Sequence, residues 1–223
     1  MMAVDTEVRR APDAHVGRVA FTGYRPQKMP FGFDETDVRC IDFKRRLAGT
    51  IEELIRQRYQ HFLSGGAMGM DMFAAEAVLQ LKDKYPNITL EMVSPFDGQA
   101  TRWAPEYRHR HQWLFDRADV ITFTGHEYHR AALFIRNQYM VDHADLLLAA
   151  YDGQSGGTRM TVEYARRKNI QIMLIQPEIR SDDCGKAFSA NILREQDGSG
   201  RWTEENRSSK YQMKRRVEKE RSR

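Results

Sequence analysis

HFLSGGAMGMDMFAAEAVLQLK, residues 61–82, decides the fold, because it joins an apolar run to a glycine turn and then to a helical pattern. Met72, Ala75 and Leu79 recur at the three- and four-residue spacing that is typical of one face of an α-helix. A strand, a tight turn and a helix in this order form the repeating unit of an α/β sheet. The stretch therefore predicts a strand at 61–63 and a helix over about 70–85.

The same unit repeats on both sides of this stretch. The patterns predict further strands at 17–23, 88–95, 118–125, 144–153 and 169–177, and further helices at about 36–60, 103–117, 131–143 and 161–168. Strands that are apolar on both faces belong to parallel sheets that helices cover on each side. The expected fold class is therefore α/β, a Rossmann-like three-layer α/β/α arrangement with a mainly parallel sheet.

Composition favours one α/β domain between two polar ends. In 223 residues, 41% are hydrophobic and 30% charged, and no run approaches the length of a membrane helix. We expect a flexible segment at 1–16, which lacks the apolar core of a secretory signal, a domain at 17–179 and a charged, disordered tail at 180–223. Two cysteines give no disulfide framework, so a cytoplasmic location is expected.

The net positive charge of the chain comes from the tail. The formal net charge is +4, and residues 201–223 hold nine basic and four acidic residues, which leaves residues 1–200 close to neutral. A basic tail predicts at most weak nucleic-acid contact. Neither a membrane partner nor a DNA-loading surface on the domain is expected, whereas a homo-oligomer is compatible with the sequence.

Polar motifs follow five of the predicted strands. They are TGYRP, SGGAMGMD, SPFDGQ, TGHEYH and YDGQSGGT, and in parallel sheets the ligand lies beyond these carboxyl ends. In TGYRP, Gly23 and Arg25 would face that crevice, with the Arg25 guanidinium directed at a phosphate. The alternative is that Arg25 forms a structural ion pair with Asp71 or Asp152.

SGGAMGMD has the features of a phosphate-binding turn. Gly65 and Gly66 would let the backbone approach a phosphate, Ser64 would add a hydroxyl, and Gly69 would let the helix begin close to the sheet. Asp71 would cap the helix or accept a ribose hydroxyl. The alternative is a structural turn in which Asp71 is only a capping acid.

DGQSGGTRMTVEYARRK repeats this pattern of a glycine turn and a helix after the predicted strand at 144–153. Gly156, Gly157 and Thr158 precede a predicted helix, and Glu163 lies in its first turns, where it would cap the helix or reach ligand hydroxyls. Arg159 would pair with phosphate. Two such turns at the carboxyl ends of strands in one sheet suit a ligand with phosphate at one end and a sugar or base at the other.

Other constellations give weaker indications. Arg136 and Asn137 would contact the ligand or tie a helix to a loop. The pairs His109/His111 and His126/His129 lack a third ligand at metal spacing, so no metal site is expected, and nothing predicts a cofactor.

With these residues in view, the chain resembles the YpsA-like proteins of the SLOG superfamily of Rossmann-like folds. The resemblance spans about residues 17–177 and rests on FTGYRP, FLSGGAMGMDMFAAEAVLQLK, SPFDGQATRW, RNQYMVDHADLLLAAYDG and SGGTRMTVEYA. The superfamily also contains DNA-processing protein A (DprA) and the LOG-type phosphoribohydrolases. The resemblance implies a nucleotide-derived ligand, such as an ADP-ribose-like molecule, at the loops already identified.

The resemblance also implies two alternatives. LOG enzymes cleave an N-glycosidic bond with a PGG-x-GT-x-x-E motif, whose spacing Gly156, Gly157 and Glu163 match, but Ser155, Arg159 and Met160 replace its proline, third glycine and threonine. The turn is closer to the SG…T…A form of DprA, which binds single-stranded DNA and the recombinase RecA. Near-neutral charge outside the tail argues against that activity here.

The sequence thus predicts a nucleotide-type ligand-binding domain that acts as a cytoplasmic sensor or regulator. The alternatives are a phosphoribohydrolase, in which Glu163 or Asp71 would be catalytic, and a DprA-like DNA-binding protein. Whether the protein is an enzyme is left open. The predicted binding residues are Gly23, Arg25, Ser64, Gly65, Gly66, Gly69, Asp71, Gly156, Gly157, Thr158 and Glu163.

Overall fold

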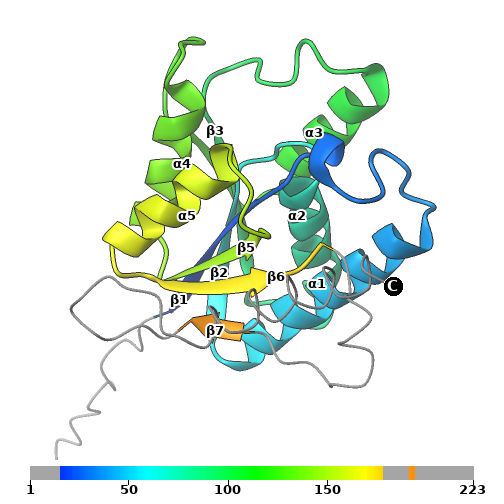
Figure 1. Ribbon diagram of the computed structural model, residues 1–223, viewed down its shortest axis with the longest axis vertical. Coiled ribbons are helices and arrows are strands. Elements are labelled where there is room, and N and C mark those ends of the chain that lie inside the picture. Colours follow the sequence, from blue (N-terminus) through cyan, green and yellow to red (C-terminus); the bar gives the residue numbers. More distant parts are fainter. Residues whose placement is uncertain (1–15, 178–190, 194–223) are drawn as a thin grey trace, which may run out of the picture. The chain divides into compact units, whose positions relative to one another are not determined.

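Strand β1 (Gly17–Gly23) lies at the centre of a seven-stranded sheet in the order β4-β3-β2-β1-β5-β6-β7 (Figure 1). The structure is a computed structural model, and it describes residues 16–177 and the backbone of 191–193. β1 to β6 run parallel, and β7 pairs antiparallel with β6. The predicted fold class is confirmed. The other strands are β2 (Tyr59–Ser64), β3 (Thr89–Ser94), β4 (Val120–Phe123), β5 (Leu146–Ala150), β6 (Gln171–Ile175) and β7 (Asn191–Leu193).

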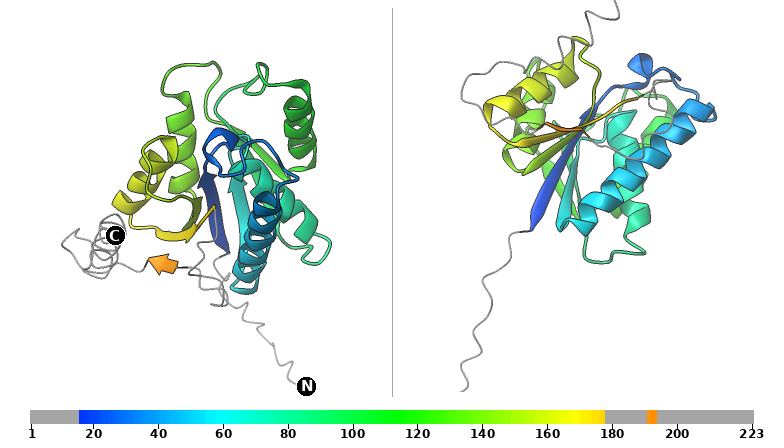
Figure 2. Two further views of the ribbon diagram at one scale, coloured as in Figure 1. Left: turned by 45° about the vertical axis from the view of Figure 1, so that its right-hand side comes forward. Right: turned by 60° about the horizontal axis from the view of Figure 1, so that its bottom comes forward.

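Helices cover both faces of the sheet, as Figure 2 shows. α1 packs on α2 and α2 on α3, whereas α4 packs on α5. These helices are α1 (Val38–Arg56), α2 (Met70–Leu81), α3 (Pro105–Arg117), α4 (Ala132–Asp142) and α5 (Gly157–Arg167), and a short 3-10 helix, η1, spans Pro26–Lys28. None of the helices in the described residues combines the length and apolar character that crossing a bilayer requires.

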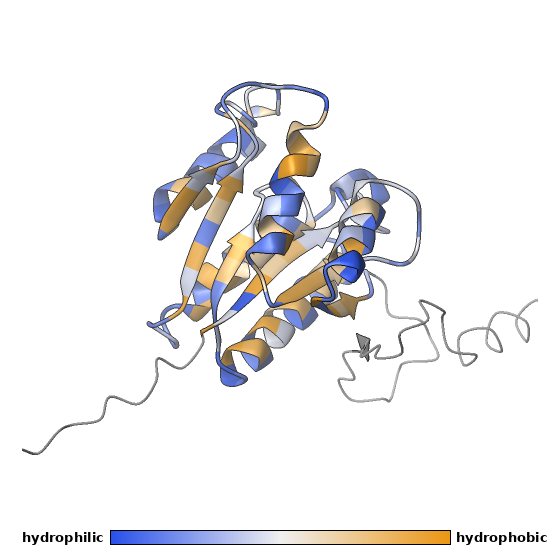
Figure 3. Cartoon of the chain, turned by 90° about the vertical axis from the view of Figure 1, so that its left-hand side faces the viewer, coloured by the Kyte–Doolittle hydropathy of each residue, from blue (hydrophilic) through white to orange (hydrophobic). Residues whose placement is uncertain are grey.

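The core lies where the helices meet the sheet. Phe21 of β1 and Phe62 of β2 stack with ring centroids 5.9 Å apart, and both are fully or almost fully buried. Apolar residues concentrate along the strands and on the sides of the helices that face them (Figure 3). Burying such side chains contributes about 1.5–3 kcal/mol each, so the sheet is a rigid platform for the loops at its ends.

The helix boundaries correct the sequence expectations in three places. α2 ends at Leu81 and not near Tyr85, because the chain turns at residues 82–84. α1 ends at Arg56 and not near Gln60, because Arg58 has a positive φ of 72° that stops the helix and starts β2. α5 begins at Gly157 and not at Thr161, because Gly156, with φ 142°, lets the chain turn directly into the helix. The early start of α5 places Gly157 and Thr158 inside the helix and moves Glu163 to its second turn.

The predicted ends of the chain fall mostly outside the described residues. This holds for the expected flexible segment, 1–16, apart from Val16, and for the expected disordered tail, 180–223, apart from β7. At 191–193 the structure has a strand in place of the expected irregular chain. The pairing of Ile172 to Leu174 with these residues explains the difference, because β6 would otherwise be the edge of the sheet.

Candidate functional site

The direction of the sheet order reverses between β1 and β5. β2, β3 and β4 follow on one side of β1, and β5 and β6 lie on the other. Gly23 pairs with Ala150, so the two strands end at the same level and their loops leave side by side. In open α/β sheets the ligand binds beyond the carboxyl ends of the strands at this reversal.

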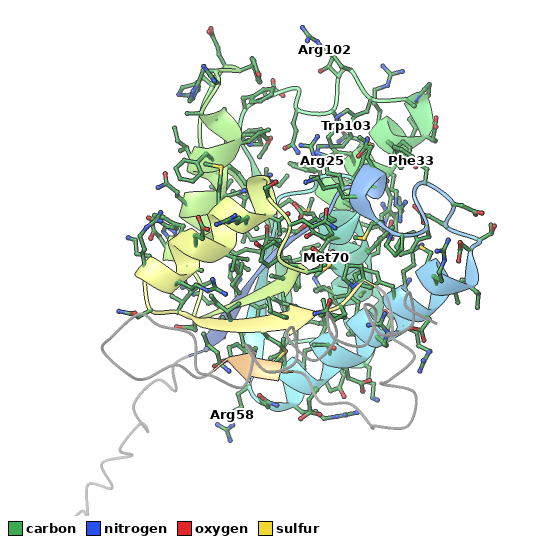
Figure 4. The ribbon with its side chains drawn as sticks, viewed as in Figure 1. Arg25, Phe33, Arg58, Met70, Arg102 and Trp103 are labelled. Carbon is green, nitrogen blue, oxygen red and sulfur yellow. The ribbon has the colours of Figure 1, made fainter. Side chains whose placement is uncertain are left out.

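A cavity of about 290 Å³ lies there, and we call it the switch cavity. Four segments line it: residues from 22 to 28, Ala67 of the glycine turn together with Asp71 of α2, the first half of α4 with Leu133, Arg136 and Asn137, and residues 156–158 at the start of α5. Figure 4 labels Arg25 at this end of the sheet and Arg58 at the opposite end. The volume is at the low end of the ~300–1,000 Å³ typical of small-molecule pockets, which suits a phosphate group better than a whole nucleotide.

Three cations and one carboxylate line the switch cavity. Arg25 and Lys28 are exposed, whereas Arg136 and Asp71 are buried. Lys28 Nζ donates a hydrogen bond of 2.6 Å to the carbonyl oxygen of Ser155, which ties η1 to the loop after β5. The excess of positive groups favours an anionic ligand.

Arg136 is the least expected feature of the site. Its side chain is only 5% exposed, and within the described residues its Nε and Nη1 atoms have no hydrogen-bond partner. Its nearest counter-charge is Asp71 Oδ2, 3.8 Å from Nη1. Burial lowers the pKa of Arg136 and raises the pKa of Asp71, and the attraction between the two only partly offsets it. A buried guanidinium with free donors calls for an acceptor, and a phosphate supplies several.

The start of α5 adds backbone donors. Gly156 is the N-cap residue, and no side chain caps the helix. A Cβ on Gly157 would meet nothing within 4 Å, so this backbone borders open space. Thr158 Oγ1 is occupied, because it donates to the carbonyl oxygen of Gly23 at 3.0 Å. An uncapped helix start carries partial positive charge and suits an anion.

Tyr24 and Asp152 hold the two loops together. The Tyr24 hydroxyl donates to the Asp152 carboxylate, and burial together with this bond raises the pKa of Tyr24 to about 12. The Tyr24 and Tyr151 rings pack edge to face with centroids 6.2 Å apart. Asp152 is therefore engaged by Tyr24, and Asp71 by Arg136, so neither expected structural ion pair of Arg25 is present in the described chain.

The glycines of the SGGAMGMD turn pack closely against other parts of the protein, and Ala67 of the same turn lines the switch cavity. A Cβ on Gly65 would overlap the Arg136 guanidinium, and one on Gly66 would lie 2.8 Å from the Met92 methyl group. Gly69, with φ 91°, lies against the backbone of Tyr24 and Arg25. Ser64 Oγ donates to the Asp71 carbonyl oxygen at 2.8 Å and accepts from the Gly66 N–H. Gly65 makes room for Arg136, Gly66 for Met92 and Gly69 for the loop after β1, and a phosphate-binding role for the turn stays a prediction.

The predicted residues separate into two groups. The structure brings six of them to the switch cavity, namely Gly23, Arg25, Asp71, Gly156, Gly157 and Thr158. It leaves Ser64, Gly65, Gly66, Gly69 and Glu163 outside the lining. Glu163 is displaced because α5 starts four residues earlier than predicted. It lies half-buried in the second turn and pairs with Arg159 Nε at 2.6 Å.

Sequence reasoning missed Lys28 and Tyr24 and left Arg136 undecided. Lys28 follows the motif TGYRP by two residues, so its position after β1 was a usable signal. Arg136 lies in the middle of a helical pattern, which does not indicate a binding role. The structure shows that its guanidinium occupies the space beside Gly65. Asn137, named with it, also lines the switch cavity and ties α4 to α5 through a 2.8 Å bond from Nδ2 to Thr161 Oγ1.

The chemistry of the site is suited to binding. Asp71 is buried beside Arg136 and Glu163 is on the surface, so the two carboxylates do not share the cavity. In the described part of the chain, no group of three or more His, Cys, Asp or Glu side chains is placed to hold a metal ion. The cations of the switch cavity and the uncapped start of α5 can together bind an anion.

Comparisons with known proteins agree with the fold. The YpsA family model, described as the YspA SLOG family, matches residues 19–179, which confirms the resemblance read from the motifs. UPF0398 proteins of Bacillus thuringiensis (strain Al Hakam) and Bacillus cereus (strain AH187) are each 29% identical over 154 residues, covering 67% of this chain and 83% of the relative.

A solved structure is similar at the level of the fold. DNA processing protein A from Helicobacter pylori, described for its single-stranded DNA binding mode, has a TM-score of 0.51 and 17% identity to this chain. The similarity covers 71% of this chain and 65% of that one, so this chain spans slightly less than two thirds of that protein.

Proposed function

Because the chain belongs to the YspA SLOG family, we propose that it binds a nucleotide or nucleotide derivative, such as an ADP-ribose-like molecule, with its phosphate in the switch cavity. The bound state would make the protein a cytoplasmic sensor or regulator. Arg136, Arg25 and the backbone at Gly157 hold the phosphate in this proposal.

The observation that carries the proposal is the buried Arg136. A guanidinium taken out of water normally has its donors satisfied, and an unpaired buried donor costs about 1–3 kcal/mol. Arg136 keeps Nε and Nη1 unbonded while facing a cavity that ends at an uncapped helix start. An anion between the two would satisfy both at once.

The hydrolase alternative has less support. It needs a carboxylate beside the ribosyl bond, and Glu163, the residue that matches the LOG motif, lies outside the lining of the switch cavity. Asp71 is committed to Arg136. A DprA-like role would take the single-stranded DNA binding of the H. pylori protein as its model, but the near-neutral charge of residues 1–200 supports a small anion better than a nucleic-acid strand.

Calorimetric titration of the purified protein with pyrophosphate, ADP and ADP-ribose tests the proposal. We expect binding that Arg25→Met weakens about fivefold to tenfold, roughly 1–1.4 kcal/mol, with an unchanged Tm because Arg25 is exposed. Arg45→Met removes an equally exposed cation from α1 and should leave binding unchanged.

The buried arginine needs a paired variant. Arg136→Met alone would leave the buried Asp71 carboxylate without a counter-charge, so it is combined with Asp71→Asn. This double variant should fold and bind no pyrophosphate. Absence of pyrophosphate, ADP and ADP-ribose binding by the wild-type protein, or full binding by the folded double variant, would contradict the proposal.

A further inference from the structure

A second cavity, of about 600 Å³, opens at the carboxyl ends of β3 and β4. We call it the outer cavity. Ser94, the loop 97–101, His111 and Phe115 of α3, and Ile121 and Phe123 of β4 line it. Polar and apolar side chains contribute equally to its lining. Sites for small organic ligands combine apolar surface with polar groups that fix the orientation of the ligand.

The Gly65–Gly66 turn separates the two cavities. A Cβ on Gly65 would overlap Arg136 on the side of the switch cavity, and a Cβ on Gly66 would lie 3.4 Å from His111 Nε2 on the other side. Gln99 Nε2 fixes the turn by donating to the Gly65 carbonyl oxygen at 3.1 Å. Since neighbouring Cα atoms are about 3.8 Å apart, the guanidinium and the imidazole lie within roughly 12 Å of each other.

His111 gives the outer cavity its polar recognition group. Its ring stacks on Phe115 with centroids 4.3 Å apart and meets the edge of Trp103 at 5.3 Å. Nε2 is buried and has no hydrogen-bond partner in the described residues. Burial, and then the charge of Arg136, lowers the pKa of His111 to about 4. The ring is therefore neutral at pH 7 and suits an uncharged polar partner.

The charges around the outer cavity also disfavour a phosphate. Asp97 and Asp116 line it together with Arg108, so carboxylates outnumber cations, the reverse of the switch cavity. The switch cavity accepts an anion but is small, and the outer cavity is twice as large and accepts a neutral group. The two cavities therefore match the phosphate end and the nucleoside end of a nucleotide.

We propose that the outer cavity binds the nucleoside end of the ligand whose phosphate lies beside Arg136, with His111 Nε2 hydrogen-bonding the base or sugar and Phe115 and Phe123 contacting its apolar face. This inference rests on the proposed function and adds where the uncharged part of the ligand lies. The ligand is then a nucleoside diphosphate or a larger nucleotide.

The test compares two probes by calorimetric titration of the full chain: pyrophosphate, and whichever of ADP, GDP, CDP or UDP the wild type binds best. His111→Phe keeps the ring stack and removes Nε2. We expect it to weaken nucleotide binding about tenfold and to leave pyrophosphate binding within twofold. His109→Phe, an exposed change on the same helix, should alter neither.

Phe123→Ala provides a second variant, because Phe123 is 52% exposed and its loss should not unfold the protein. It should also weaken only the nucleotide. Nucleotide binding unchanged in both variants, or a wild type that binds the nucleotide no more tightly than pyrophosphate, overturns the inference while the proposed function stands. A wild type that binds neither probe overturns both.

Discussion

At the scale of single residues, the site depends on an arginine that the protein leaves incompletely paired. Asp71 Oδ2 lies 3.8 Å from Arg136 Nη1, beyond hydrogen-bond distance, and Gly65, which has no side chain, leaves the space that the guanidinium occupies. Asp71 therefore balances the charge of Arg136 without using its donors. The carboxylate should hold the arginine in place and compete with an incoming anion.

Asp71→Asn separates this role from ligand contact. Removing the carboxylate leaves the Arg136 charge buried and uncompensated, so the variant should have a lower Tm without ligand. Pyrophosphate would then be the only counter-charge, and we expect it to bind about tenfold more tightly and to raise the Tm more than in the wild type. Thermal unfolding with and without pyrophosphate measures both effects.

Asp83→Asn, an exposed change in the turn after α2, is the control and should behave as wild type. If Asp71 instead holds a sugar hydroxyl, as the sequence indicated, Asp71→Asn would lose affinity for ADP and gain none for pyrophosphate.

At the scale of elements, a buried carboxylate joins β2, β3, β4 and α4. Glu91 of β3 is 6% exposed, and it accepts hydrogen bonds from His61 and Thr122 at 2.8 and 2.7 Å and from Tyr139 at 3.2 Å. Burial alone would raise the pKa of Glu91, but the bonds from His61, Thr122 and Tyr139 outweigh it and lower the pKa. The ionised carboxylate thus stabilises the packing of α4 that positions Arg136.

This cluster makes stability depend on pH in a defined direction. Because the folded pKa of Glu91 lies below the unfolded value of about 4.3, its contribution is present above pH 4.3 and is lost as the pH falls through the folded pKa. Glu91→Gln should cost about 1–3 kcal/mol at pH 7, and the difference from wild type should shrink toward pH 3.

Urea unfolding between pH 7 and pH 3 measures this difference. Glu127→Gln, on the exposed loop before α4, should match wild type at every pH. A gap between Glu91→Gln and wild type that stays constant down to pH 3 would show that the carboxylate charge does not matter.

At the scale of the whole molecule, the fold was predictable and the site only in part. Strands such as Gly17–Gly23 carry apolar side chains that the parallel sheet requires, and polar motifs mark their carboxyl ends. Gly156, Gly157 and Arg25 were found because they adjoin those strands. The role of Arg136 was left open between ligand contact and a structural tie, and His111 was considered only as a metal ligand, because each comes from the middle of a helix and packing across the Gly65–Gly66 turn decides its position.

The charge distribution leads to a prediction about DNA. Residues 201–223 hold nine basic and four acidic residues, so a chain shortened to residues 1–200 loses the net positive charge. It keeps β7, which a cut at 179 would remove. We expect the shortened chain to bind pyrophosphate as the full chain does. Any single-stranded DNA binding should fall, because each lost phosphate contact reduces the slope of log K against log salt by about 0.7.

Fluorescence anisotropy of a labelled single strand, read at several salt concentrations, measures that slope for both chains. If both chains show the same salt slope and the same affinity, the loops at the carboxyl ends of the strands contact the DNA phosphates, and Arg25 and Lys28 are the exposed cations at the switch cavity there. The switch cavity would then bind a strand in the manner of a DprA-like protein, and Arg25→Met would weaken DNA and pyrophosphate binding together. A reduced slope leaves the cavity to the small ligand and makes nucleic-acid contact a property of the tail.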